Sequence, residues 1–268
     1  MKTPASWPTG TTLPPASPVF VKMFAAYSRR YVGQHFHSLR ILKSGMPPRG
    51  CGHPLVIHVN HAAWWDPLVC LLLAREFFSD RTSFAPIDSA MLARYGFFRK
   101  LGFFGVEPRT ARGARAFLRT AHAVLASPSQ ALWLTPQGRF TDTRERPLQF
   151  EDGLGALAAR GPDAMFVPLA IEYAFWTEPR PEILVSFGAP VSTRESRTTA
   201  EWTRTFTGAL EAAQDELAAC SCRRDPADWL TLSRGRTGVG AIYDTWRRLR
   251  ARVRGGKFTA EHSPQSAP

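Results

Sequence analysis

A histidine and an aspartate stand five positions apart in segment 60–66, which reads NHAAWWD. A histidine held by a carboxylate is the smallest set of side chains that takes a proton from a hydroxyl group. The short, β-branched run 54–59 predicts a buried strand before the pair, and the apolar stretch 67–78 predicts a helix after it. His61 and Asp66 are therefore expected on a strand-to-helix turn of a rigid scaffold.

The same residues have structural alternatives. Asp66 followed by Pro67 is typical of an ordinary helix start, with the aspartate as N-cap and the proline in the first turn. His58 and His61 could instead form a metal pair, but no third ligand stands nearby in the sequence. We therefore expect no metal site.

Two further strand ends carry polar residues. Arg109 follows the apolar segment 103–107 and precedes Thr110, a suitable N-cap, so it is placed where a phosphate could bind; a solvated loop arginine is the alternative. Strand 131–135 runs into the turn 136–139, whose glycine leaves the backbone open to a ligand. Gln137 and Arg139 would project polar groups there, unless this is a plain surface turn.

A last apolar strand, 165–171, contains Pro168, and proline in a strand is typical of an edge, a strand start or a bulge. In this order the four segments resemble the glycerolipid acyltransferase family, the 1-acylglycerol-3-phosphate acyltransferases and their PlsC-like relatives. The likeness covers about residues 35–190. The family has four short sequence blocks. The first is matched by Asn60, His61 and Asp66, and the second by Gly102 and Arg109. The third is matched in part by Pro136, Gln137 and Gly138, and the fourth by Val167 and Pro168.

The resemblance implies acyl transfer without a covalent enzyme intermediate. His61 would act as general base on an acceptor hydroxyl, which attacks the thioester of acyl-CoA or acyl-carrier protein, and Asp66 would fix the tautomer of His61. Arg109 would hold an acceptor phosphate or a similar anion. The implied substrate-binding residues are Asn60, Arg109, Gln137, Gly138 and Arg139, and no cofactor is implied beyond the acyl donor as co-substrate.

The sequence departs from the family in its third block. Gln137 stands where the family has glutamate, and Phe140 stands where it has arginine, while Arg139 is one position earlier. The acceptor pocket is therefore altered. Besides lysophosphatidic acid, another lyso-phospholipid, an aminolipid, a glycolipid, or a polyketide or isoprenoid alcohol fits this pattern.

The alternation of strand-like and helix-like segments predicts a single α/β domain, residues 18–257, with a mostly parallel sheet flanked by helices. The tails 1–17 and 258–268 are rich in small and polar residues and are expected to be disordered. The expected strands are 54–59, 82–86, 103–107, 131–135, 165–171 and 182–187. The expected helices are 67–78, 88–100, 110–126, 152–160 and 199–219.

Amphipathic helices are expected at both ends of this domain. The first, 18–43, places Phe20 and Phe24 on one face, and the second, 240–257, combines an apolar stripe with arginines, with no acidic residue within 247–257. The residues expected to contact an anionic membrane are Phe20, Phe24, Trp246, Arg247, Arg250 and Arg254. The alternative for the second helix is a helix docked on the core through Trp246.

The composition limits the classes of partner that the protein is expected to bind. The net charge of +12 and pI near 10.3 suit anionic lipids, phosphorylated ligands or nucleic acid, but no nucleic-acid-binding module is recognisable. No segment approaches the roughly 20 apolar residues that span a bilayer. The four cysteines show no zinc or disulfide pattern, although the pair Cys220 and Cys222 is a weak metal or redox signal.

These observations predict a peripheral protein on the cytoplasmic face of the cell membrane, with a lyso-lipid acceptor and an acyl donor as partners. Two functional alternatives stay open: a hydrolase of acyl thioesters or lipids that uses the same pair, and a non-catalytic lipid-binding protein of the same fold.

Overall fold

The computed structural model describes residues 13–48, 50 and 52–235 of the 268-residue chain. The strands are β1 (Ser38–Leu42), β2 (Leu55–Val59), β3 (Thr82–Asp88), β4 (Phe103–Val106), β5 (Gln130–Leu134), β6 (Met165–Ala174), β7 (Glu182–Phe187), β8 (Val191–Ser192) and β9 (Trp229–Arg234). The helices are α1 (Pro18–His35), α2 (Asp66–Phe77), α3 (Ser89–Arg94), α4 (Ala111–Leu125), α5 (Gly153–Arg160) and α6 (Thr199–Arg223), with short 3₁₀ turns η1 (Gly96–Leu101) and η2 (Pro226–Asp228).

The strands form one sheet in the order β4-β3-β5-β2-β6-β7-β1-β9, and β8 pairs with β6 outside this path. Pairing is parallel from β4 to β6 and between β7 and β1, and antiparallel for β6 with β7, β6 with β8, and β1 with β9. The expected single α/β domain with a mostly parallel sheet is confirmed. Because β2 to β5 run parallel, their carboxyl ends share one edge of the sheet, the edge that carries His61.

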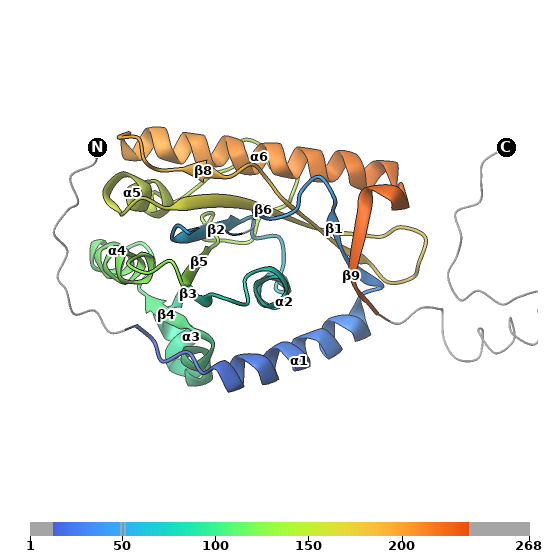
Figure 1. The fold of residues 1–268 in the computed structure, drawn as a ribbon, viewed down its shortest axis with the longest axis horizontal. Helices are drawn as coiled ribbons and strands as arrows, with labels where there is room; N and C mark the ends of the chain where they lie inside the picture. The colour runs from blue at the N-terminus through green and yellow to red at the C-terminus, as the bar shows by residue number, and fades with distance from the viewer. Residues whose placement is uncertain (1–12, 49, 51, 236–268) are drawn as a thin grey trace, which may run out of the picture.

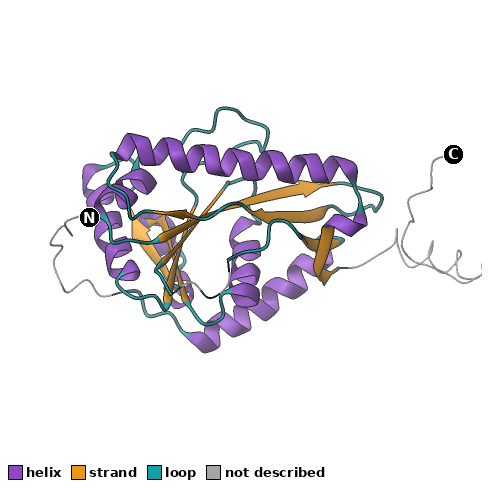
Figure 2. Ribbon diagram, turned by 45° about the horizontal axis from the view of Figure 1, so that its top comes forward, coloured by secondary structure: helices purple, strands orange, loops and turns teal. Residues whose placement is uncertain are grey.

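Helices cover both faces of the sheet (Figures 1 and 2). On one face α1 and α2 pack against β1, β2, β6 and β7 around side chains such as Ile57, Val69 and Val185. On the other face α4, α5 and α6 pack against β2, β3, β5 and β6 around Leu132, Phe166 and Phe206. Figure 1 shows α6 running along one side of the sheet and α1 along the opposite side.

The expected helix over 18–43 is wrong beyond residue 35. α1 ends at His35, and Ser38–Leu42 form β1 instead, which pairs in parallel with β7. Leu39 and Ile41 alternate into the core on the α2 side of the sheet, so tertiary pairing overrides the local helical pattern. The expected helix 88–100 is likewise divided into α3 and η1.

Several other boundaries differ from expectation. β8 and β9 were not predicted; β9 adds an antiparallel strand to β1 through a sequence, WLTLSR, that is short but rich in strand-forming residues. Residues 13–17, expected in a disordered tail, contact the domain: the N–H of Ser17 donates to the carbonyl of Lys100, and Leu13 packs on the core. Residues 1–12, the expected helix 240–257 and the tail 258–268 lie outside the described residues.

None of the described helices combines the length and the apolar character that crossing a membrane requires.

Candidate active site

The pair His61 and Asp66 is assembled as the sequence predicts, on the turn between β2 and α2. Nδ1 of His61 lies 2.8 Å from Oδ2 of Asp66, and the side chains are 19 % and 1 % exposed. The imidazole thus has one nitrogen on a nearly buried carboxylate while the ring still reaches the surface. This arrangement fixes the ring and leaves Nε2 as the nitrogen that can take a proton from a ligand.

Asp66 is the first residue of α2 rather than its N-cap. The N-cap position belongs to Trp65, which makes no side-chain capping bond. The carboxylate of Asp66 instead accepts hydrogen bonds from the backbone N–H of Ala63 at 3.0 Å and from the hydroxyl of Tyr173 at 2.7 Å. The structural alternative of a simple capping aspartate is therefore not what the structure shows.

Asn60 pairs with the backbone of β6 rather than facing a ligand. Its Nδ2 donates to the carbonyl of Ile171 at 3.0 Å, and its Oδ1 accepts from the N–H of Ile171 at 2.8 Å. β2 ends at Val59, opposite Leu169, so the Asn60 side chain continues the ladder by one step. The residue is 1 % exposed, and its effect on the site is to hold the turn that follows.

Gln137 also faces inward. Its Oε1 accepts a hydrogen bond from the N–H of His61 at 2.8 Å, its Nε2 donates to Oγ1 of Thr141, and the residue is 4 % exposed. The N–H of Thr141 donates to the carbonyl of His61 at 2.9 Å. The loop after β5 is thereby fastened to both backbone groups of His61, so Gln137 positions the histidine instead of projecting into a pocket.

The next residues of this loop are more exposed. Gly138 has φ 64, a conformation that glycine adopts without strain, and the turn requires it there. Arg139 pairs with Glu145 at 2.8 Å and is half exposed. Phe140, 58 % exposed, lies over the imidazole of His61 with ring centroids 4.2 Å apart.

Arg109 lies at the same edge of the sheet as His61 but farther along it. It follows β4, which is separated from β2 by β3 and β5, so at about 4.8 Å per strand the two strand ends lie about 14 Å apart. Arg109 is exposed, with φ 57 in the left-handed region that is rare outside glycine. Thr110 caps α4 as expected, its hydroxyl accepting from the N–H of Gly113 at 2.9 Å.

A hollow of about 900 Å³ lies beside the end of β6, lined in part by Ala62 and Ala63 of the turn that carries the pair. Its apolar walls include Phe36, Trp65, Tyr173 and Leu217, and Glu172 adds a carboxyl group. Burial raises the pKa of Glu172 above its ordinary value, against the effect of a hydrogen bond from Ser221. No motif in the sequence marks this hollow, because β6, α1 and α6 meet there only through the tertiary fold.

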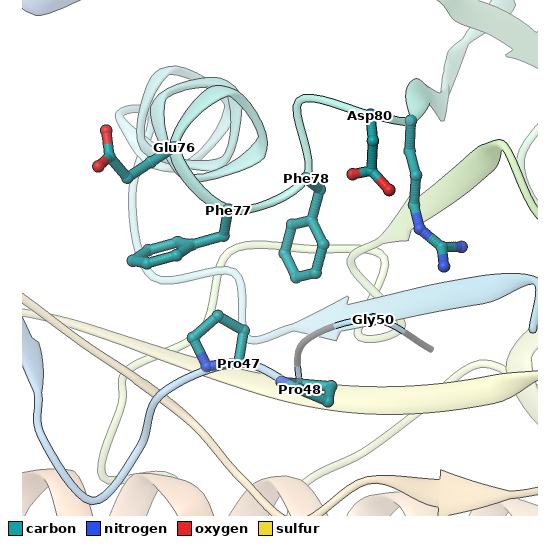
Figure 3. A pocket seen from close by; sticks show the side chains of 8 residues that line it. Pro47, Pro48, Gly50, Glu76, Phe77, Phe78 and Asp80 are labelled. Atoms are coloured by element: carbon teal, nitrogen blue, oxygen red, sulfur yellow. The ribbon is translucent and has the colours of Figure 1, made fainter. Parts of the chain in front are cut away.

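A smaller hollow of about 240 Å³ lies at the opposite edge of the sheet, between the segment before β2 and the end of α2. Figure 3 shows the ring of Phe78 pointing toward Pro48 and the ring of Phe77 extending sideways beneath α2. None of the site residues expected from sequence lines it, so we assign it no part in the chemistry.

His58, which the sequence could pair with His61 as a metal ligand, lies inside the sheet. It is fully buried in β2 beside Phe150 and Phe206, and burial lowers its pKa to about 3, so the ring is neutral. Across the part of the chain that the structure describes, no cluster of three or more potential ligands is suited to a metal ion.

Two comparisons place the chain among known proteins. A family model described as Acyltransferase matches residues 34–172, just over half of the 268 residues. The fold is similar to the crystal structure of the 1-acyl-sn-glycerophosphate (LPA) acyltransferase PlsC from Thermotoga maritima, with a TM-score of 0.55 and 14 % identity, covering 74 % of this chain and 80 % of that one. No curated protein matched. The matched region contains His61, Asp66, Arg109 and Gln137, and the chain belongs to the Acyltransferase family and is an acyltransferase.

Proposed function

We propose that this protein is a membrane-peripheral O-acyltransferase that moves a fatty acyl group from acyl-CoA or acyl-carrier protein to a lyso-phospholipid or a related lipid hydroxyl. The observation that carries the proposal is the contact between His61 and Asp66 inside the region that matches the family. A base held in this way next to an apolar hollow is what the deprotonation of a lipid hydroxyl requires.

In this reaction Nε2 of His61 takes the proton as the acceptor oxygen attacks the thioester carbonyl. The new ester bond forms as the carbon–sulfur bond breaks, and the proton passes from the imidazolium to the departing thiolate. Asp66 stabilises the imidazolium between these steps. General-base help of this kind contributes about 10²–10⁴ in rate, and positioning of the two substrates supplies the rest.

Arg109 is the residue to which we assign an anionic group of the acceptor. Its exposed position at the start of α4 brings together a guanidinium and the N-terminus of a 15-residue helix. The strained backbone of Arg109 is consistent with a functional position. Phe140, in contrast, presents an apolar ring directly over His61, so the surroundings of the reacting hydroxyl favour a neutral group.

Contact with the membrane is assigned to an exposed stripe on α1. Phe20 and Phe24, which the sequence places at the membrane, are partly buried and pack on Phe97 at 6.3 and 6.1 Å. Val19, Met23 and Tyr27 stand one turn apart on the outer side of α1 and are 79, 59 and 53 % exposed. Exposed Lys22, Arg29 and Arg30 lie on the same helix and add the charge that an anionic surface attracts.

The experiment that tests the activity is acyl transfer by purified protein to a panel of lyso-lipids, followed by mass spectrometry, with His61→Ala as the matched variant. We expect wild-type transfer and a loss of about 10²-fold or more in His61→Ala, with unchanged thermal unfolding. Release of free fatty acid without transfer to any acceptor would favour the hydrolase instead. Equal activity of a well-folded His61→Ala would remove His61 as the base.

A further inference from the structure

Tyr173 connects the catalytic pair to the end of β6. Its hydroxyl donates to Oδ1 of Asp66 at 2.7 Å, while Oδ2 of the same carboxylate lies 2.8 Å from His61 and 3.0 Å from the N–H of Ala63. The two oxygens therefore have different partners on opposite sides. The Tyr173 ring packs against Phe36 with centroids 5.6 Å apart, which fixes the direction of the hydroxyl.

The chemistry of this contact makes Tyr173 a permanent donor. Burial, together with the neighbouring Asp66 carboxylate, raises the pKa of the Tyr173 phenol well above its ordinary range. Cys70, one turn along α2, stays a neutral thiol because burial and the charge of Asp66 raise its pKa. The titratable groups that interact with Asp66 are thus His61, Tyr173 and Cys70, and of these residue types only histidine ordinarily titrates near neutral pH.

We propose that Tyr173 is a positioning residue of the active site, which acts on His61 through Asp66. Its hydroxyl fixes the rotation of the carboxylate, so that Oδ2 stays in line with Nδ1 of His61. It also draws negative charge toward Oδ1, so Asp66 stabilises the protonated form of His61 less. The neutral imidazole, which acts as the base, then persists to lower pH. This inference rests on the proposed function of His61 as the base.

Removal of the hydroxyl has a defined effect on the pH dependence. In Tyr173→Phe the nearly buried Oδ1 loses its donor, and the charge of Asp66 concentrates on the side of the imidazole. Protonated His61 is then favoured. The acid limb of the pH profile, in which kcat/KM falls as the base becomes protonated, therefore moves to higher pH. A tyrosine that only fills space would change the stability of the fold and leave this limb in place.

The first test is steady-state kinetics of Tyr173→Phe across pH, with Tyr95→Phe as the matched control at the exposed junction of α3 and η1. We expect the acid limb to rise by about 0.5–1 pH unit and kcat to fall about tenfold, with KM changing less than about twofold. Tyr173→Phe should cost nothing further in an Asp66→Asn background, because the residue acts through that carboxylate.

A second test keeps the ring and the hydroxyl in place. Incorporation of 3-fluorotyrosine at position 173 strengthens the donor, so the acid limb should move to lower pH, opposite to Tyr173→Phe. The titration midpoint of the His61 ring by NMR should shift in the same two directions, and this readout needs no acyl transfer. An unmoved midpoint in both variants overturns the proposal for Tyr173; absence of acyl transfer by the wild type overturns the proposed function instead.

Discussion

The side-chain carbonyl of Gln137 accepts a hydrogen bond from the backbone N–H of His61 at 2.8 Å. This contact joins the loop after β5 to the turn after β2, and the N–H of Thr141 completes the connection by donating to the carbonyl of His61 at 2.9 Å. The glutamate-to-glutamine departure from the family therefore falls on a buried residue that holds the base in place.

Replacement of Gln137 should separate this positioning effect from any effect of charge. Gln137→Leu leaves the N–H of His61 without an acceptor, and we expect kcat to fall about tenfold. Gln137→Glu keeps an acceptor at the same place, and Thr141 can then donate to it, so kcat should stay within about threefold of wild type. Steady-state kinetics with a thermal-unfolding control checks this pair. A leucine variant as active as the glutamate variant would show that the contact does not matter.

Phe140 should determine which acceptors are preferred. The ring lies over His61 at 4.2 Å between centroids, where a positive side chain would instead attract an anion. In Phe140→Arg we expect the ratio of kcat/KM for a lyso-lipid with a phosphomonoester to that for a neutral lyso-lipid to rise about tenfold or more. Phe140→Leu, which keeps an apolar side chain, is the control and should leave the ratio near wild type. The idea fails if the arginine variant shows no change in the ratio.

His58 should make the fold sensitive to acid. The folded state holds it neutral with a pKa of about 3, whereas the unfolded state binds the proton near pH 6.5. Its contribution to stability is therefore complete above pH 6.5 and is lost as the pH falls toward 3, by up to about 1.4 kcal/mol per pH unit. Denaturant unfolding between pH 7 and 4 measures this slope. His58→Leu should flatten it, while His53→Gln, at a partly exposed position, should not.

Membrane binding should depend on the outer stripe of α1. Met23→Asp places a carboxylate in the middle of the exposed apolar residues, and we expect co-sedimentation with phosphatidylglycerol vesicles to fall several-fold. Gln149→Asp changes the charge equally at an exposed position outside α1 and serves as control. High salt should weaken binding of the wild type, as should deletion of residues 241–257. Equal sedimentation of Met23→Asp and Gln149→Asp would exclude the stripe as the contact.

Much of this architecture could be predicted from sequence because the signals are local. The apolar periodicity of α4 and the β-branched run of β2 locate these elements nearly to the residue, and the site pair falls where β2 meets α2. The order of four such segments then carried the resemblance to the family. Asp66 and His61 could be paired in advance because only four residues of one turn separate them.

Other features depend on contacts between distant segments, which one sequence does not reveal. Tyr173 is 107 positions from Asp66, and β1 is 140 or more positions from the strand it joins, so neither partner is visible locally. Asn60 and Gln137 lie in expected motifs, but their side chains face the backbone rather than a ligand because β2 ends just where both can pair inward. The helix expected over 36–43 is absent for the same reason, because residues 38–42 pair as a strand with β7.

The pairing of Asn60 with Ile171 has a consequence for how the chain finds its alignment. A slip of β2 by one residue against β6 would move His61 by about 3.3 Å and send its side chain to the other face of the sheet. Only in the native alignment do both ends of the Asn60 amide meet the N–H and the carbonyl of a single residue. The contact therefore stabilises the native register of β2 against β6 one position before the base. Because His61 follows directly, the same register also fixes the position of the histidine.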